Sequence, residues 1–202
     1  MHKIKIEYYD KNIIIINKPI GIEIFNFLKN KIKNKLPNKG ILNRLDKYTS
    51  GIILIARNLM FYFFYKKIIL KKMIKKKYIA IVEQKKFSNG FINLCIFKKR
   101  KILIKKYFKK SLTFYKKLKN LHENNIYNIY IKTGRTHQIR KHLKFSNIII
   151  KNEFYYNKKI KLINTLHHKK ISFFYPLIMK NFVLYCNLPI EMKKIFLINI
   201  LK

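Results

Sequence analysis

Short runs rich in β-branched and aromatic residues recur along this chain, and they constrain its fold more than any other feature. Eight runs are typical of β-strands and cover Ile4–Tyr8, Asn12–Asn17, Ile52–Ala56, Lys77–Glu83, Phe91–Phe97, Ser111–Tyr115, Tyr127–Lys132 and Lys170–Tyr175. Three segments are typical of helices: Asn58–Met73, Thr136–Phe145 and, after Pro189, Ile190–Leu201. The strands outnumber the helices and do not alternate with them regularly. This order predicts an α+β fold with a mostly antiparallel sheet, and not a doubly wound parallel sheet.

The length and the apolar content predict one compact domain. The chain has 202 residues, of which 49 % are hydrophobic, so it can bury a substantial core and is not a disordered polycation. We therefore predict a single domain over residues 1–202. Uncharged apolar stretches of about 18 residues are missing, as is the apolar region of a signal peptide. We expect no membrane span and a cytoplasmic location.

The formal net charge of +39 indicates a polyanionic partner, with nucleic acid the first choice and an anionic membrane surface the second. A second explanation stays open for most individual lysines. Only five of the 47 basic residues are arginine, and the residues used most are those with A/T-rich codons. A mutational drift toward A and T would raise the lysine content without selection for any partner.

The residue types that such a drift does not supply gather in three short segments. Three of the five glycines and three of the five arginines lie in Asn17–Gly21, Asn43–Gly51 and Thr133–Arg140. Arginine offers a planar, always charged guanidinium group that can form two parallel hydrogen bonds to one carboxylate or phosphate, which lysine cannot. We therefore expect these three segments to form the functional site.

The middle segment places Asp46 just before a Thr-Ser-Gly turn that leads into the apolar run Ile52–Ala56. A side chain at the mouth of a strand is well placed to face a cleft. The alternative is that the Asp46 carboxylate only organises the turn, as aspartate often does.

The third segment predicts a helix start that binds anions. Gly134 opens a turn, Thr136 can cap the helix, and Ile139 and Leu143 lie one turn apart on its buried face. Two arginines beside a helix N-terminus suit a phosphate or a carboxylate. The alternative is a solvated basic helix face.

A metal site is not expected. Only eight residues are acidic, and the chain has no Cys-x-x-Cys pair. His137 and His142 are five residues apart, which is not the spacing of a helical metal pair, and His167 and His168 are adjacent.

At these residues the sequence resembles the RluA family of pseudouridine synthases. The family's His-Arg-Leu-Asp-x-x-Thr-Ser-Gly motif stands here as Asn43–Gly51, and its Gly-Arg-Thr-His-Gln-Ile-Arg motif stands intact at Gly134–Arg140. Its Asn-Lys-Pro-x-Gly and Lys-x-Tyr motifs match Asn17–Gly21 and the strand around Tyr78. The resemblance implies the pseudouridine synthase fold: a mixed, mostly antiparallel sheet with flanking helices and a central catalytic cleft. We expect this catalytic domain only, without the S4 domain of many relatives.

The sequence departs from the family pattern in two places. Asn43 replaces the histidine of the first motif, which puts a supporting contact in doubt. After the third motif, relatives carry Gly-Asp-x-x-Tyr, where this chain has only the similar residues Glu153 and Tyr156.

The resemblance implies that the chain isomerises uridine in ribosomal or transfer RNA to pseudouridine. Asp46 would be the nucleophile, attacking either the ribose or the uracil ring. A carboxylate in a cleft stays ionised more readily beside an arginine, and Arg140 is our first choice for that role, with Arg135 the second. Tyr78 would lie against the uracil and assist removal of the C5 proton.

The resemblance also implies RNA contacts. Arg44 would occupy or brace the space that the flipped base vacates, and Lys18 and Arg135 would bind phosphates. We also expect Thr49 and Gln138 to contact RNA. No cofactor is expected, and we expect a monomer. Two alternatives stay open: an inactive RNA-binding or ribosome-assembly protein with the same fold, and a generic basic nucleic-acid binder whose motifs match by accident.

Overall fold

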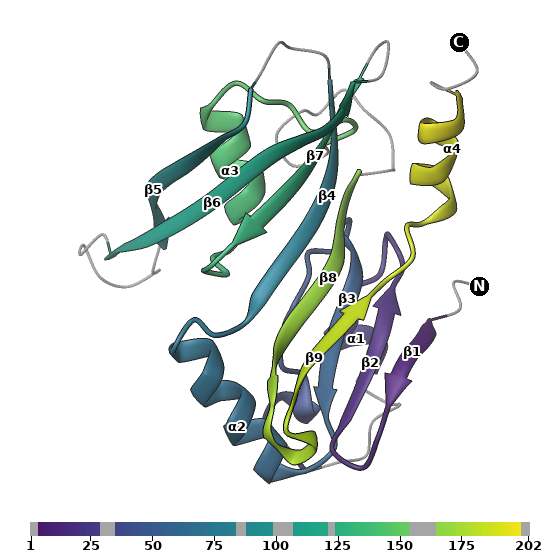
Figure 1. Cartoon of the computed structure of the whole chain (residues 1–202), viewed down its shortest axis with the longest axis vertical. Helices are drawn as coiled ribbons and strands as arrows, with labels where there is room; N and C mark the ends of the chain where they lie inside the picture. Colours follow the sequence, from purple (N-terminus) through teal and green to yellow (C-terminus); the bar gives the residue numbers. More distant parts are fainter. Residues whose placement is uncertain are drawn as a thin grey trace.

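The computed structural model describes residues 4–28, 35–83, 88–98, 107–120, 124–153 and 165–198. Its centre is one nine-stranded sheet in the order β1-β2-β3-β8-β4-β7-β6-β5, with β9 paired to β8 (Figure 1). The strands are β1 Lys5–Tyr9, β2 Ile13–Lys18, β3 Ser50–Ala56, β4 Lys75–Glu83, β5 Gly90–Lys98, β6 Tyr107–Asn120, β7 Asn124–Ile131, β8 Leu166–Tyr175 and β9 Lys180–Tyr185. Among these strands only β3 and β8 pair in parallel. The predicted α+β, mostly antiparallel architecture is confirmed.

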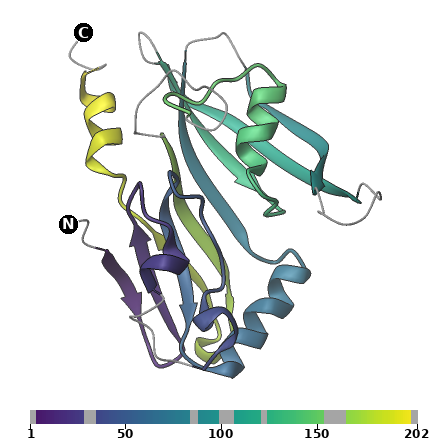
Figure 2. The same ribbon diagram turned by 180° about the vertical axis from the view of Figure 1, so that it is seen from behind.

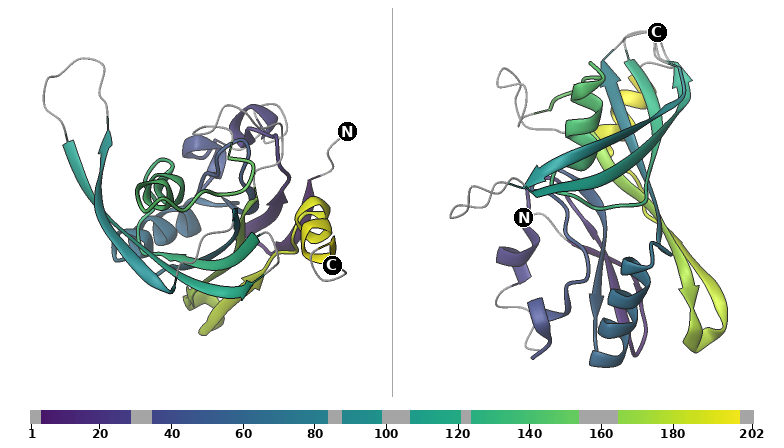
Figure 3. Two further views of the ribbon diagram at one scale, coloured as in Figure 1. Left: turned by 90° about the horizontal axis from the view of Figure 1, so that it is seen from above. Right: turned by 90° about the vertical axis from the view of Figure 1, so that its left-hand side faces the viewer.

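Four α-helices flank this sheet in the described residues: α1 Ile24–Leu28, α2 Leu59–Leu70, α3 Gln138–Phe145 and α4 Ile190–Ile198. Figure 2 shows α1 and α3 on the same side of the molecule. Figure 3 shows α2 between the β1–β3 layer and the β8–β9 arm. None of these helices is long and apolar enough to cross a membrane. The single domain over residues 1–202 stays a prediction, which the continuous sheet supports.

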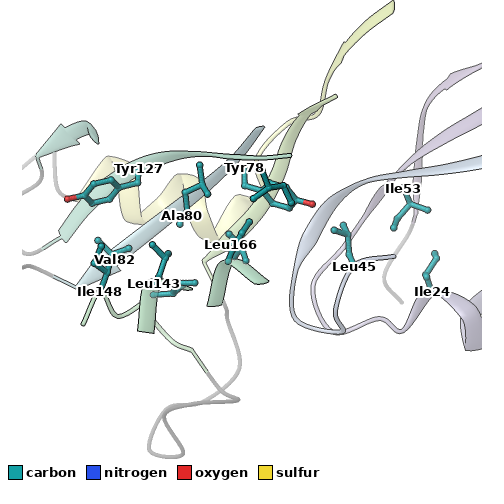
Figure 4. Close-up of a cluster of buried hydrophobic side chains, with 14 of the residues drawn as sticks. Ile24, Leu45, Ile53, Tyr78, Ala80, Val82, Tyr127, Leu143, Ile148 and Leu166 are labelled. Atoms are coloured by element: carbon teal, nitrogen blue, oxygen red, sulfur yellow. The ribbon is translucent and has the colours of Figure 1, made fainter. Parts of the chain in front are cut away.

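The alternation of side chains along the strands sorts the core into layers. On β2 and β3, one set of isoleucines packs on α1, and the other set packs on α2 together with Ile171 and Phe173 of β8. On β4, Tyr78 and Ala80 point to the α3 side, whereas Ile79 points to α4. The cluster on the α1 and α3 side is drawn in Figure 4.

The parallel contact of β3 with β8 needs a glycine at position 51. Gly51 has φ +114°, and a Cβ there would clash with the carbonyl oxygen of His168. An L-residue would have to push the two strands apart. Gly51 therefore allows the strand that follows the Asp46 turn to run beside His168.

The structure differs from the sequence prediction at several elements. The short helix α1 and the strand β9 were not predicted, and β8 begins at Leu166 instead of Lys170. Helix α3 begins at Gln138 instead of Thr136, because His137 takes the cap position with φ 53°. Helix α4 was predicted to Leu201, but residues 199–202 lie outside the described residues.

His167 and His168 give the fold a dependence on pH. Both are buried, and burial lowers the pKa of each to about 3. Unfolded histidines take up protons below about pH 6.5, whereas these two stay neutral in the folded state. The contribution of these two histidines to the free energy of unfolding is therefore complete above about pH 6.5. It falls at lower pH by about 1.4 kcal/mol per pH unit for each histidine.

We expect urea denaturation to show this loss between pH 6 and pH 5, where carboxylates are still largely ionised. The variant His168→Gln should remove about half of the part of this slope that His167 and His168 contribute together. Equal stability of the unmodified chain at pH 7 and pH 5 would contradict the assignment.

Candidate active site

The loop that carries Asp46 is fixed to β3 by backbone bonds and by Asn43. The Asn43 amide donates to Ile52 O over 3.0 Å, and its Oδ1 accepts from Leu54 N over 2.7 Å. Asn43 thus supplies a supporting contact at the position that the motif described above gives to histidine. The turn is closed by Thr49 N–H donating to the backbone carbonyl of Asp46 over 3.0 Å. This bond uses the backbone of Asp46, so the carboxylate is not what closes the turn.

Lys18 supports this loop from the inside, which corrects the prediction that it binds phosphate. Its side chain is fully buried, and Nζ donates to the carbonyls of Pro19, Ile22 and Lys47 over 2.8–3.0 Å. Burial lowers the pKa of Lys18 to about 7, and the Asp46 carboxylate opposes this shift. Its three donors are committed to carbonyls, so Lys18 positions the Asp46 loop.

Arg140 joins three parts of the site with one guanidinium group. Its Nη1 lies 3.4 Å from Asp46 Oδ2, its Nε lies 3.3 Å from Glu153 Oε2, and its Nη2 donates to Thr49 Oγ1 over 3.0 Å. The side chain is fully buried. A planar fork held on three sides fixes the direction in which the Asp46 carboxylate faces. The pairing of Arg140 with Asp46 agrees with the expectation from the sequence.

His137 forms a second contact with Asp46. Its Nε2 lies 3.6 Å from Asp46 Oδ1. Burial lowers the pKa of His137, Arg140 and Lys141 lower it further, and the Asp46 carboxylate opposes the shift. The left-handed backbone at His137 turns its ring toward Asp46 at the start of α3.

Tyr78 comes from β4, on the other side of the site. Its ring stacks on His168, with centroids 4.5 Å apart and planes 14° apart. The His168 ring is itself held by a 2.9 Å bond between Nδ1 and Ile52 O. Burial and the nearby Asp46 carboxylate raise the pKa of Tyr78, so its hydroxyl stays protonated. Figure 4 shows this hydroxyl pointing toward the side where Leu45 lies.

Asp46, Tyr78, His137 and Arg140 line one cavity of about 490 Å³. That volume suits a small ligand group such as a nucleoside. Asp46, Tyr78 and Arg140 all line it, so the structure brings the three predicted catalytic residues together. Arg44 is exposed at its rim. Arg135 also lines it, with a buried Nε that lacks a hydrogen-bond partner among the described residues.

Two predicted RNA contacts are instead internal. Thr49 is buried, and its hydroxyl accepts from Arg140. Gln138 is buried, with Oε1 accepting from Thr133 Oγ1 and Arg135 N, and Nε2 donating to Leu112 O and Thr113 Oγ1. Both residues border the cavity. Their polar atoms are used to hold Arg140 and the turn before α3, which is why they are not free for RNA.

Three residues of the site were given no catalytic or RNA-binding role from the sequence. His137 contacts Asp46, and Glu153 contacts Arg140. Lys76 lines the cavity, and burial lowers its pKa to about 8. Lys76 could have been found from strand alternation, because it lies two residues before Tyr78. Among the described residues, no group of three or more His, Cys, Asp or Glu is arranged to hold a metal ion.

The sequence profile of RNA pseudouridylate synthases matches residues 12–145, a range that includes Lys18, Asp46, Tyr78 and Arg140. The chain belongs to the RNA pseudouridylate synthase family. The members of this family are isomerases. Glu153 lies beyond the matched range, so its contact with Arg140 is known from the structure alone.

Several curated relatives in this family are similar over much of the chain. "Ribosomal large subunit pseudouridine synthase D" of Borreliella burgdorferi is 35 % identical, over 84 % of this chain and 60 % of the relative. The protein of that name from Buchnera aphidicola subsp. Schizaphis graminum is 31 % identical, over 94 % and 71 %. An "Uncharacterized RNA pseudouridine synthase" of Helicobacter pylori is 33 % identical, over 85 % and 72 %. The chain thus spans only 60 % of the length of the Borreliella relative.

Solved structures share the fold. "Human RNA Pseudouridylate Synthase Domain Containing 1" aligns with a TM-score of 0.77 at 18 % identity, covering 93 % of this chain and 84 % of that one. "Human RNA Pseudouridylate Synthase Domain Containing 4" aligns with a TM-score of 0.74 at 22 % identity, covering 93 % and 90 %. The predicted pseudouridine synthase fold is confirmed.

The ion pair of Glu153 with Arg140 predicts a stability effect. Both side chains are buried, so Glu153→Gln leaves the guanidinium with one carboxylate fewer. We expect the free energy of unfolding to fall by about 3 kcal/mol. Glu23→Gln removes the same charge at an exposed position and should change it by less than about 0.5 kcal/mol. Urea denaturation of both variants measures the two changes. Equal changes in the free energy of unfolding would show that the ion pair of Glu153 with Arg140 does not stabilise the fold.

Proposed function

We propose that this chain isomerises uridine in RNA to pseudouridine, with Asp46 as the nucleophile. The observation that carries the proposal is the position of the Asp46 carboxylate. It borders a cavity of nucleoside size, faces the buried guanidinium of Arg140 at 3.4 Å, and shares the cavity with Tyr78. The fixed guanidinium would orient the carboxylate for attack.

The reaction conserves atoms and needs no oxidant or reductant. The bond between uracil N1 and ribose C1′ breaks, the uracil turns, and C5 forms a bond to C1′. The proton on C5 leaves, and N1 gains a proton. Attack by Asp46 on the ribose or on the uracil ring would both need the ionised carboxylate within reach of the nucleoside.

Tyr78 would act in the proton step. Its raised pKa makes it a neutral phenol and not a phenolate. A neutral hydroxyl can accept the C5 proton only while it releases its own, so Tyr78 would work as a relay. The stack on His168 fixes the ring for this task.

The target uridine must leave its helix to enter the cavity, which costs a few kcal/mol of unstacking. Arg44, exposed at the rim, would fill or brace the vacated position. Arg135, whose Nε has no hydrogen-bond partner in the described part of the chain, would bind a phosphate beside the target nucleotide.

We propose ribosomal RNA of the large subunit as the substrate, because the Borreliella and Buchnera relatives carry that substrate in their names. Transfer RNA is the other substrate that we would test. Chemical mapping of pseudouridine in both RNAs, incubated with and without the protein, decides between them. The proposal predicts new modified positions in ribosomal RNA. New positions in transfer RNA alone would contradict the substrate, and none in either RNA would contradict the activity.

A further inference from the structure

A row of exposed aromatic and basic side chains crosses the face of the sheet opposite the cavity. The strand register places the row's members directly opposite one another, so their side chains share one face. From β5 to β9 the row consists of Phe91, Phe114, Tyr130, Lys77, Lys170 and Tyr185. Figure 1 looks onto this face, and Figure 3 shows α1 and α3 on the other side. With strands about 4.8 Å apart, the row is about 24 Å long.

The rings of the row are open to solvent. The exposed fractions are 66 % for Phe91, 37 % for Phe114, 40 % for Tyr130 and 58 % for Tyr185. The helix α4 covers the same face only further along β4, at Ile79 and Ile81. The four rings therefore offer a stacking surface that the described residues do not cover.

Lysines are interleaved with the rings. Lys77 Nζ lies 6.0 Å from the ring centroid of Tyr130, and Lys170 Nζ lies 4.7 Å from that of Tyr185. Lys77 and Lys170 stand directly opposite each other on β4 and β8, where two like charges repel. A bound phosphate between them would remove that repulsion. The pKa of Tyr185 is lowered by Lys170, Lys77 and Lys169, which reflects the positive potential at this end of the row.

We propose that this row is a second RNA-binding surface, which holds a single-stranded segment by stacking bases on the rings and pairing phosphates with the lysines. Exposed aromatic side chains on a sheet, together with a basic surround, are how single-stranded RNA is bound without sequence preference. The surface lies on the face opposite the cavity, so it would hold a different segment from the one that carries the target uridine. The proposal is independent of the activity proposed above.

The charge pattern favours RNA over a lipid surface. Exposed lysines, Lys75 and Lys116, lie two residues from the row on its two sides. The rings therefore form a narrow line between charges and not a continuous apolar patch that could enter a bilayer.

A fluorescent reporter can test the surface directly, because the chain has no tryptophan. The substitution Phe91→Trp places an indole in the row, and Tyr9→Trp places one on exposed β1 as the control. A 12-nucleotide oligouridylate should quench the first indole in a saturable way and leave the second unchanged. Polyphosphate has the charge but no bases, so it should not quench either indole.

Removing the other rings should weaken this binding. In the Phe91→Trp background, the triple variant Phe114→Thr, Tyr130→Thr and Tyr185→Thr should raise the half-saturating oligouridylate concentration about tenfold or more. Tyr9→Thr in the same background is the matched control and should change it less than about twofold. If the triple variant does not fold, Lys77→Gln with Lys170→Gln serves instead, with a rise of about fivefold or more.

Three outcomes would overturn the proposal. The first is an absence of quenching by oligouridylate. The second is quenching that the ring and lysine variants leave unchanged. The third is quenching by phosphatidylserine vesicles but not by RNA, which would make the row a membrane-binding surface.

Discussion

Replacing Asp46 with Asn is expected to lower pseudouridine formation by at least about 10⁴-fold, because it removes the nucleophile. Asparagine keeps the shape of the side chain and can still accept a hydrogen bond from Arg140, so the fold should be kept. RNA affinity should change less than about threefold, because the substitution removes a negative charge and no base or phosphate contact. Single-turnover product formation and fluorescence anisotropy with the same RNA measure the two quantities.

The control for Asp46→Asn must remove one negative charge elsewhere. Asp10, the only other aspartate, is unsuitable because its carboxylate accepts bonds from Asn12 N, Ile13 N and Tyr8 Oη in the turn before β2. Glu23→Gln changes an exposed residue and should leave turnover unchanged. Turnover by Asp46→Asn within tenfold of the unmodified chain would contradict the assignment. If neither the unmodified chain nor Asp46→Asn forms product and both bind RNA equally, the chain is an RNA-binding protein with this fold.

The second large effect is expected for Tyr78→Phe, which should lower product formation by about 10²- to 10⁴-fold. The ring stays in place on His168, so RNA affinity should hold within about threefold. Only the hydroxyl that would relay the C5 proton is lost. Single-turnover rates and anisotropy measure the two effects.

An isotope experiment separates this role from a merely structural one. With RNA that carries deuterium at uracil C5, Tyr78→Phe should show a larger rate difference between hydrogen and deuterium than the unmodified chain. Tyr9→Phe removes a hydroxyl at an exposed position and should change neither the rate nor the isotope effect. Normal turnover by Tyr78→Phe would exclude the hydroxyl from the chemistry.

Local sequence patterns predicted most of the strands, because runs of β-branched residues form strands wherever they can be buried. The run Ile52–Ala56 lies within β3, and Lys77–Glu83 lies within β4. Strand β9 was not predicted, although four of its six residues, Phe182–Tyr185, are apolar or aromatic; only Phe182 is buried, and pairing with β8 forms the strand. The start of β8 was missed because two adjacent histidines do not resemble a strand. They are buried there by contact with β3 and β4, far away in the sequence.

The rare residue types located the site but did not reveal each residue's partner. Asp46 and Arg140 were found because aspartate and arginine stand out in a lysine-rich chain. The burial of Lys18 could not be predicted in the same way, since nothing in the sequence distinguishes a buried lysine from the many exposed ones. Its role depends on three carbonyls that the fold brings around its ammonium group. Thr49 and Gln138 were assigned to RNA for the same reason: their internal partners come from distant segments.

The central claim is that this chain forms pseudouridine at the Asp46 cavity, and release of the C5 hydrogen tests it most directly. RNA labelled with tritium at uracil C5 loses the label to water only when C5 bonds to the ribose. We predict that the unmodified chain releases one tritium for each pseudouridine formed and that Asp46→Asn releases none above background. Tritium release by both proteins, or by neither while both bind the RNA, would contradict the account.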